Sequence, residues 1–166
     1  MRLIIIDDKL IVLKQLRNIL SPLAEKMEII IVYCQMSGDI EQMTVPDDNI
    51  YVVKTKKELC SLCAKVLKFE ENDYYLVDVT LFGEDQVDLL FSQYGSVEFA
   101  DYLADQLKDK LKLKFYTRPD GISVQDFANE TEKWDLPIYR PELSKNSQEE
   151  DAKASFFESV KEFCNV

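Results

Sequence analysis

Short apolar runs and segments of helical periodicity alternate along the whole chain. Residues 2–7 are rich in isoleucine and typical of a buried strand, and residues 9–20 then place leucine and isoleucine at helical spacing. Further strands are predicted at 28–34, 74–78, 112–117 and 136–139, and further helices at about 56–68, 96–109, 123–132 and 149–163. A strand followed by a helix, five times over, predicts an α/β fold: a doubly wound five-stranded parallel sheet with helices on both faces.

Local signals indicate where several helices begin. Thr55 is expected to cap the helix at 56–68, and Glu58 three residues later would complete a capping box. Ser96 is expected to cap the helix that follows the third strand, and Ser123 is expected at the start of the next one.

The length and composition favour one domain, residues 1–166, because 166 residues with 46% hydrophobic content can form one core of ordinary size. A long polar connection at about 35–53 is expected to form an insertion in this domain. Its last residues, 50–53, have the composition of a short extra strand.

The chain is acidic, with 20 Lys and Arg against 31 Asp and Glu and a net charge of −11. Without a basic cluster, direct binding to nucleic acid or to an anionic membrane is disfavoured, and a partner with a basic surface suits the chain better. No run of 18 apolar residues and no signal-peptide pattern is present, so we expect a soluble, cytoplasmic protein.

Histidine and cysteine usage excludes several chemistries. The chain has no histidine, which removes Ser-His and Cys-His catalysis. Cys60 and Cys63 form a C-x-x-C pair inside a predicted helix, with no second pair at zinc-finger spacing. They are interpreted as small side chains on a buried helix face.

Carboxylates follow two of the predicted strands. Asp7 and Asp8 end the first apolar run, and Asp78 ends the run at 74–78. Since ligands collect at the carboxyl ends of parallel strands, these three acids are expected to meet in one acidic site. Such a site is costly unless a cation neutralises it, so the sequence predicts a divalent-metal site with one carboxylate free to react.

The order of polar residues at successive strand ends resembles that of a response-regulator receiver domain (CheY-like), over essentially the whole chain. The matching residues are Asp7 and Asp8 after the first strand, Asp78 after the third, Thr117 after the fourth, and Arg140-Pro141 after the fifth. The resemblance implies a flavodoxin-like fold and a Mg²⁺ ion held by Asp7, Asp8, Asp78 and the backbone carbonyl of Thr80. It further implies that Asp78 is the phosphoacceptor, with Thr117 and Arg140 contacting the phosphoryl group.

The function implied by this resemblance is that of a stand-alone receiver in a two-component phosphorelay. It would take a phosphoryl group from a sensor histidine kinase or a phosphotransfer protein and signal by contact with a downstream protein or by self-association. Its chemistry would be limited to its own phosphorylation and slow hydrolysis, so it would not be an enzyme in the usual sense.

Three positions depart from the family pattern. Arg140 stands where the family has lysine, Phe82 where it usually has proline, and Pro137 where it has an aromatic switch residue, with Tyr139 nearby on the strand's other side. These departures favour an alternative, a phosphorylation-independent pseudo-receiver that acts as a binding module. A third alternative, an aspartyl-phosphate hydrolase of the haloacid-dehalogenase type, is disfavoured because no Asp-x-Asp pattern follows the first strand.

Overall fold

The computed structural model describes residues 1–35, 50–81, 95–118, 127, 133–141 and 148–166. Six strands form one sheet: β1 (Arg2–Asp7), β2 (Glu28–Cys34), β3 (Ile50–Val53), β4 (Asp73–Asp78), β5 (Leu113–Thr117) and β6 (Ile138–Tyr139). The strands are all parallel and lie in the order β3-β2-β1-β4-β5-β6. Without the edge strand β3, this order is the doubly wound arrangement of the flavodoxin-like fold.

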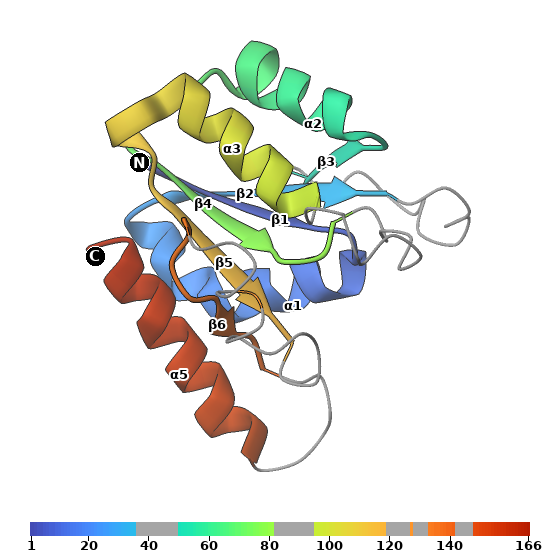
Figure 1. Ribbon diagram of the computed structural model, residues 1–166. Coiled ribbons are helices and arrows are strands. Elements are labelled where there is room, and N and C mark those ends of the chain that lie inside the picture. The colour runs from blue at the N-terminus through green and yellow to red at the C-terminus, as the bar shows by residue number, and fades with distance from the viewer. Residues whose placement is uncertain (36–49, 82–94, 119–126, 128–132, 142–147) are drawn as a thin grey trace.

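The described helices are α1 (Leu10–Leu20), α2 (Lys56–Ser61), α3 (Gly95–Leu107) and α5 (Gln148–Phe163). A 3₁₀ helix at Ser21–Glu25 follows α1, a π-helical turn at Leu62–Leu67 continues α2, and a 3₁₀ turn at Lys108–Lys110 follows α3. Figure 1 shows α2 and α3 on one face of the sheet and α1 and α5 on the other. The predicted fold class, with helices on both faces, is therefore confirmed.

The number of strands differs from the prediction. The five expected strands are present, but the sheet has six, because Ile50–Val53 pairs with the outer edge of β2 as the parallel strand β3. Aromatic and β-branched residues suit a half-covered edge, and the register aligns Ile50 with Ile31. The rest of the expected insertion, residues 36–49, and most of the helix expected at 123–132 lie outside the described residues.

The two faces of the sheet bury separate cores, as the two-residue period of a strand requires. In β1, Ile4 and Ile6 pack with α2 and α3, whereas Leu3 and Ile5 pack with α1 and α5. All four side chains have no exposed surface. A central parallel strand covered on both faces must be apolar throughout, which explains the uninterrupted aliphatic run.

The Thr55 cap is confirmed, but the capping box around it and the Ser96 cap need correction. Thr55 accepts a hydrogen bond from the Glu58 backbone N–H (3.1 Å) as predicted, but the Glu58 carboxylate accepts from the N–H of Lys54 (2.8 Å), one residue before the cap. Ser96 is not a cap but the second residue of α3, and its buried hydroxyl donates to the carbonyl of Val79.

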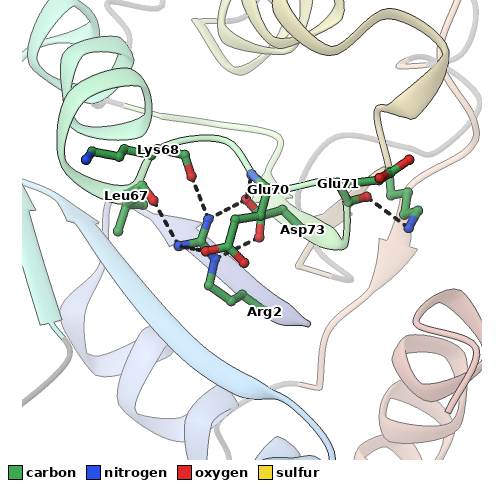
Figure 2. Close-up of polar contacts among 7 residues, drawn as sticks. Arg2, Leu67, Lys68, Glu70, Glu71 and Asp73 are labelled. Carbon is green, nitrogen blue, oxygen red and sulfur yellow. Dashed lines mark hydrogen bonds and ion pairs between the residues drawn. The ribbon is translucent and has the colours of Figure 1, made fainter.

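At the amino ends of the central strands, a buried arginine joins β1 to the turn before β4 (Figure 2). The guanidinium of Arg2 donates to both carboxylate oxygens of Asp73 (2.7 and 2.6 Å) and to the carbonyls of Leu67 (2.9 Å) and Lys68 (2.8 Å). The exposed Glu70 is a second acidic partner, with its Oε1 3.2 Å from Nη1 of Arg2. With these acceptors the buried charge of Arg2 is well satisfied, so an ion pair holds this end of the sheet together.

Within the described residues, no helix combines the length and the hydrophobicity that crossing a bilayer requires.

Candidate functional site

The three predicted carboxylates meet at the carboxyl end of the sheet. Asp7 ends β1, Asp8 follows it, and Asp78 ends the neighbouring strand β4. One carboxylate oxygen from each lies within 4.8 Å of the others, and the residues are only 1%, 5% and 8% exposed. Among the described residues this is the single group of three acidic or metal-ligating side chains with such spacing. Parallel strands in register bring the acids together although seventy residues of sequence separate them.

Asp7 is oriented by hydrogen bonds to both of its carboxylate oxygens. Its Oδ1 accepts from the backbone N–H of Lys9 (2.8 Å), and its Oδ2 accepts from the hydroxyl of Tyr116 (2.6 Å). Lys9, not Asp8, occupies the cap position of α1, and it makes no side-chain cap bond.

Burial and mutual repulsion make Asp7 and Asp78 hard to ionise. Burial first, and then the charge of Asp8, raises the pKa of Asp7 to about 7, although the bonds from Tyr116 and the Lys9 N–H oppose the shift. Burial, followed by the charges of Asp7 and Asp8, also raises the pKa of Asp78 well above its usual range. Ionised Asp7 and Asp78 are therefore unfavourable at neutral pH, and a bound cation would lower the cost of ionising them.

The remaining predicted site residues stand at or just after the carboxyl ends of the strands. Thr80 donates its hydroxyl to Oδ2 of Asp78 (3.1 Å), a contact in addition to the carbonyl role expected for this residue. Thr117 is the last residue of β5, 4% exposed, and its carbonyl accepts from the backbone N–H of Arg140 (2.9 Å).

Arg140 follows β6 and is 8% exposed. Its Nη1 donates to the carbonyl of Pro141 (3.2 Å), and its positive charge is close enough to lower the pKa values of Asp7 and Asp78 in opposition to burial. Arg140 is therefore a buried positive charge near the acids. Because it follows β6, it lies toward the opposite edge of the sheet from β2.

The donor set fits Mg²⁺. Three buried carboxylates offer hard oxygen ligands and an excess of negative charge, and the raised pKa values of Asp7 and Asp78 indicate that a bound cation would be favourable there. Asp7, Asp8 and Asp78 are the side chains that would hold such an ion. Soft ligands are poorly suited to the role, because burial raises the pKa of the Cys34 thiol, at the end of β2, and keeps it protonated.

Sequence reasoning missed Tyr116. The residue lies within the strand predicted at 112–117 and is not singled out there, but its hydroxyl reaches Asp7. The available signal was its position directly before Thr117, at a strand end, because a buried tyrosine generally needs a partner for its hydroxyl.

The positions that depart from the family pattern are only partly described. Pro137 is buried and immediately precedes β6, where its missing N–H helps to explain why the strand begins at Ile138 instead of 136. Tyr139 is 48% exposed, on the outer strand of the sheet. Phe82 lies outside the described residues.

The solved structures to which the chain is similar include two response regulators. One, from Colwellia psychrerythraea, has a TM-score of 0.47 and 14% identity and covers 97% of this chain and 96% of that chain. The other, a receiver protein from Dyadobacter fermentans, has a TM-score of 0.46 and 11% identity and covers 98% of this chain and 96% of that chain. No protein-family model and no curated protein matches the chain. Values this low do not establish a shared function, so the proposed function depends on the geometry of the acidic site.

Proposed function

We propose that this chain is a receiver domain that accepts a phosphoryl group on Asp78 with the help of Mg²⁺. The observation that carries the proposal is the meeting of Asp7, Asp8 and Asp78, buried and within 4.8 Å, at the carboxyl ends of two adjacent parallel strands. Three carboxylates buried this close together repel one another and lose their hydration, which destabilises the fold, so a cluster of this kind is better explained by a cation site than by a structural role. Signalling by contact with another protein is part of this proposal.

Each residue has a defined part in the proposed reaction. A carboxylate oxygen of Asp78 attacks the donor's phosphorus; the new O–P bond forms as the bond to the leaving group breaks, and the leaving group keeps the electron pair. Bound Mg²⁺ would neutralise the acids and the phosphoryl oxygens, held by the three carboxylates and the carbonyl of Thr80. Thr117 would donate a hydrogen bond to one phosphoryl oxygen, and Arg140 would pair with another.

Asp78 must lose its proton before it can attack. Its raised pKa means that phosphorylation of the isolated protein should be slow where the acid is protonated, and faster where the pH is higher or a cation lowers that pKa. The Thr80 hydroxyl, which donates to Oδ2 of Asp78, leaves the second carboxylate oxygen for attack.

The arginine in place of the family's lysine supports the main alternative, a pseudo-receiver that binds partners without phosphorylation. Arg140 already donates to the carbonyl of Pro141, and its planar fork pairs with phosphate in a geometry different from that of an ammonium group. We favour the phosphorylated form because the same guanidinium acts electrostatically on Asp7 and Asp78.

The proposed partners follow from the chemistry and the charge. A sensor histidine kinase or a phosphotransfer protein would supply the phosphoryl group, and a downstream protein or a second copy of the chain would receive the signal. A net charge of −11 favours partners with a basic contact surface and disfavours direct nucleic-acid or membrane binding.

The test is intact-mass analysis after incubation with acetyl phosphate, with Mg²⁺ or with a chelator. We expect a gain of one phosphoryl group that requires Mg²⁺, is absent in Asp78→Asn, and is unchanged in the control Asp105→Asn, which removes an exposed carboxylate of α3. Thr117→Ala is expected to keep the label but to weaken the response to it.

Labelling of Asp78→Asn at the wild-type rate would show that another residue is the acceptor. If neither acetyl phosphate nor a phosphorylated histidine donor labels the wild type, the pseudo-receiver is correct. Multiple turnover of a generic phosphate ester would instead identify a hydrolase.

A further inference from the structure

We propose that Tyr116 is a positioning residue for the cation site: its hydroxyl holds the Asp7 carboxylate in the orientation in which Asp7, Asp8 and Asp78 together bind a divalent cation. This inference rests on the proposed metal site and adds a residue from outside its ligand set. The direct observation is the 2.6 Å hydrogen bond from the Tyr116 hydroxyl to Oδ2 of Asp7, with Tyr116 fully buried.

The bond crosses the sheet from one side of the site to the other. Tyr116 belongs to β5 and is aligned with Asp78 of β4, while Asp7 belongs to β1 on the far side of β4. The hydroxyl therefore connects the two strands that flank the proposed acceptor. Its oxygen also lies 3.4 Å from the carbonyl of Ile6, the residue before Asp7, which further defines its place.

The ring that carries this hydroxyl is itself held on two sides. The ring packs on the α5 side of the sheet. Its centroid lies 6.3 Å from that of the Phe156 ring, and the two ring planes meet at 76°. On the backbone side, the carbonyl of Tyr116 accepts from the N–H of Val79, directly after Asp78 (2.9 Å). A buried ring fixed in this way delivers its hydroxyl to one point, which is what positioning requires.

The consequence for Asp7 is a carboxylate that cannot rotate freely. Its Oδ1 is held by the N–H of Lys9 and its Oδ2 by Tyr116, yet each carboxylate oxygen accepts more than one bond and keeps a site for a cation. Mg²⁺ demands near-octahedral geometry, so a ligand that is already oriented binds it more tightly than one that must be ordered. Loss of such an outer hydrogen bond costs about 10-fold to 100-fold in metal affinity.

The experiment is calorimetric titration of the metal-free protein with Mg²⁺ at constant pH. Tyr116→Phe removes one oxygen and keeps the ring, and we expect its Mg²⁺ dissociation constant to rise about 10-fold. Tyr74→Phe is the matched control: it deletes the hydroxyl of another buried tyrosine, which packs edge-on against Phe163 in the same core. Its Mg²⁺ affinity should equal that of the wild type.

A purely structural role for the hydroxyl would lower the urea midpoint of Tyr116→Phe without changing its Mg²⁺ affinity, and that outcome overturns the inference. If Tyr116→Phe does not fold, Phe156→Leu serves instead, because it keeps the hydroxyl and loosens the ring; unchanged affinity there also overturns it. Failure of the proposed function is distinguishable, since wild-type protein would then bind Mg²⁺ no better than Asp8→Asn does.

Discussion

Raising the pH is expected to destabilise the metal-free protein, because Asp7 must ionise inside the fold. Its pKa rises from 3.8 to about 7, chiefly through burial. Each pKa unit corresponds to about 1.4 kcal/mol, so the full difference between the two pKa values lowers the free energy of unfolding by about 4 kcal/mol. About 3 kcal/mol of this loss falls between about pH 5 and about pH 8. Asp7 is 1% exposed, so solvent screening does not reduce this figure much. Asp78, whose pKa is also raised, adds to the effect with the same sign.

The sign follows from proton binding. An acid with a raised pKa in the folded state holds its proton there more tightly than in the unfolded chain. The native protein therefore binds more protons between the two pKa values, and the free energy of unfolding falls as the pH rises from about 4 to beyond about 7. Mg²⁺ binds the ionised acids, so the stability that it adds should grow over the same range.

The assay is urea unfolding at several pH values, in chelator and in excess Mg²⁺. We expect the free energy of unfolding in chelator to fall by about 3 kcal/mol from about pH 5 to about pH 8, and the fall to shrink in Asp7→Asn and in Mg²⁺. The control Asp105→Asn removes an exposed carboxylate and should keep the wild-type slope. A stability in chelator that stays level or rises over this range would refute the electrostatic account of the site.

Three further predictions concern the scaffold and are read from the same urea curves. Arg2→Ala should destabilise the protein by about 3–5 kcal/mol, because it leaves the carboxylate of Asp73 buried without its cation; a loss below about 1 kcal/mol would contradict this. Thr55→Ala should cost about 1 kcal/mol through the lost cap bond to the N–H of Glu58, whereas Thr55→Ser should cost little. Leu76→Ala, at a fully buried position of β4, should cost about 2–5 kcal/mol through the cavity it leaves, and an unchanged urea midpoint would count against tight packing there.

Much of the fold could be predicted because its central strands are covered on both faces. The strands β1, β2 and β4 each contain an unbroken apolar run, and β2 was predicted with the bounds that the structure shows, Glu28–Cys34. The edge strands were harder to predict. The sequence indicated β3 only as a short extra strand, and β6 is two residues long instead of the expected four. Edge strands bury less, so their residues carry a weaker pattern.

The site was predictable in its members but not in its contacts. Acids at the ends of β1 and β4 must meet if those strands are parallel neighbours, and the structure brings Asp7, Asp8 and Asp78 together. The contact of Tyr116 with Asp7 depends on the order of the strands and on which face of the sheet each side chain lies. Neither can be predicted from the local sequence around these residues. The same is true of Arg2, whose partners lie 65 to 71 residues away.

The sequence by itself determined which segments are strands and helices and which residue types end the strands, since both follow from local periodicity and from burial. Only the tertiary structure decided how the acids are oriented and what ionising them costs. A carboxylate's pKa depends on the dielectric around it and on charges and donors within a few ångströms, here Asp8, Tyr116 and Arg140 acting on Asp7. Those neighbours come from β5 and the end of β6 as well as from β1, and only folding brings them together.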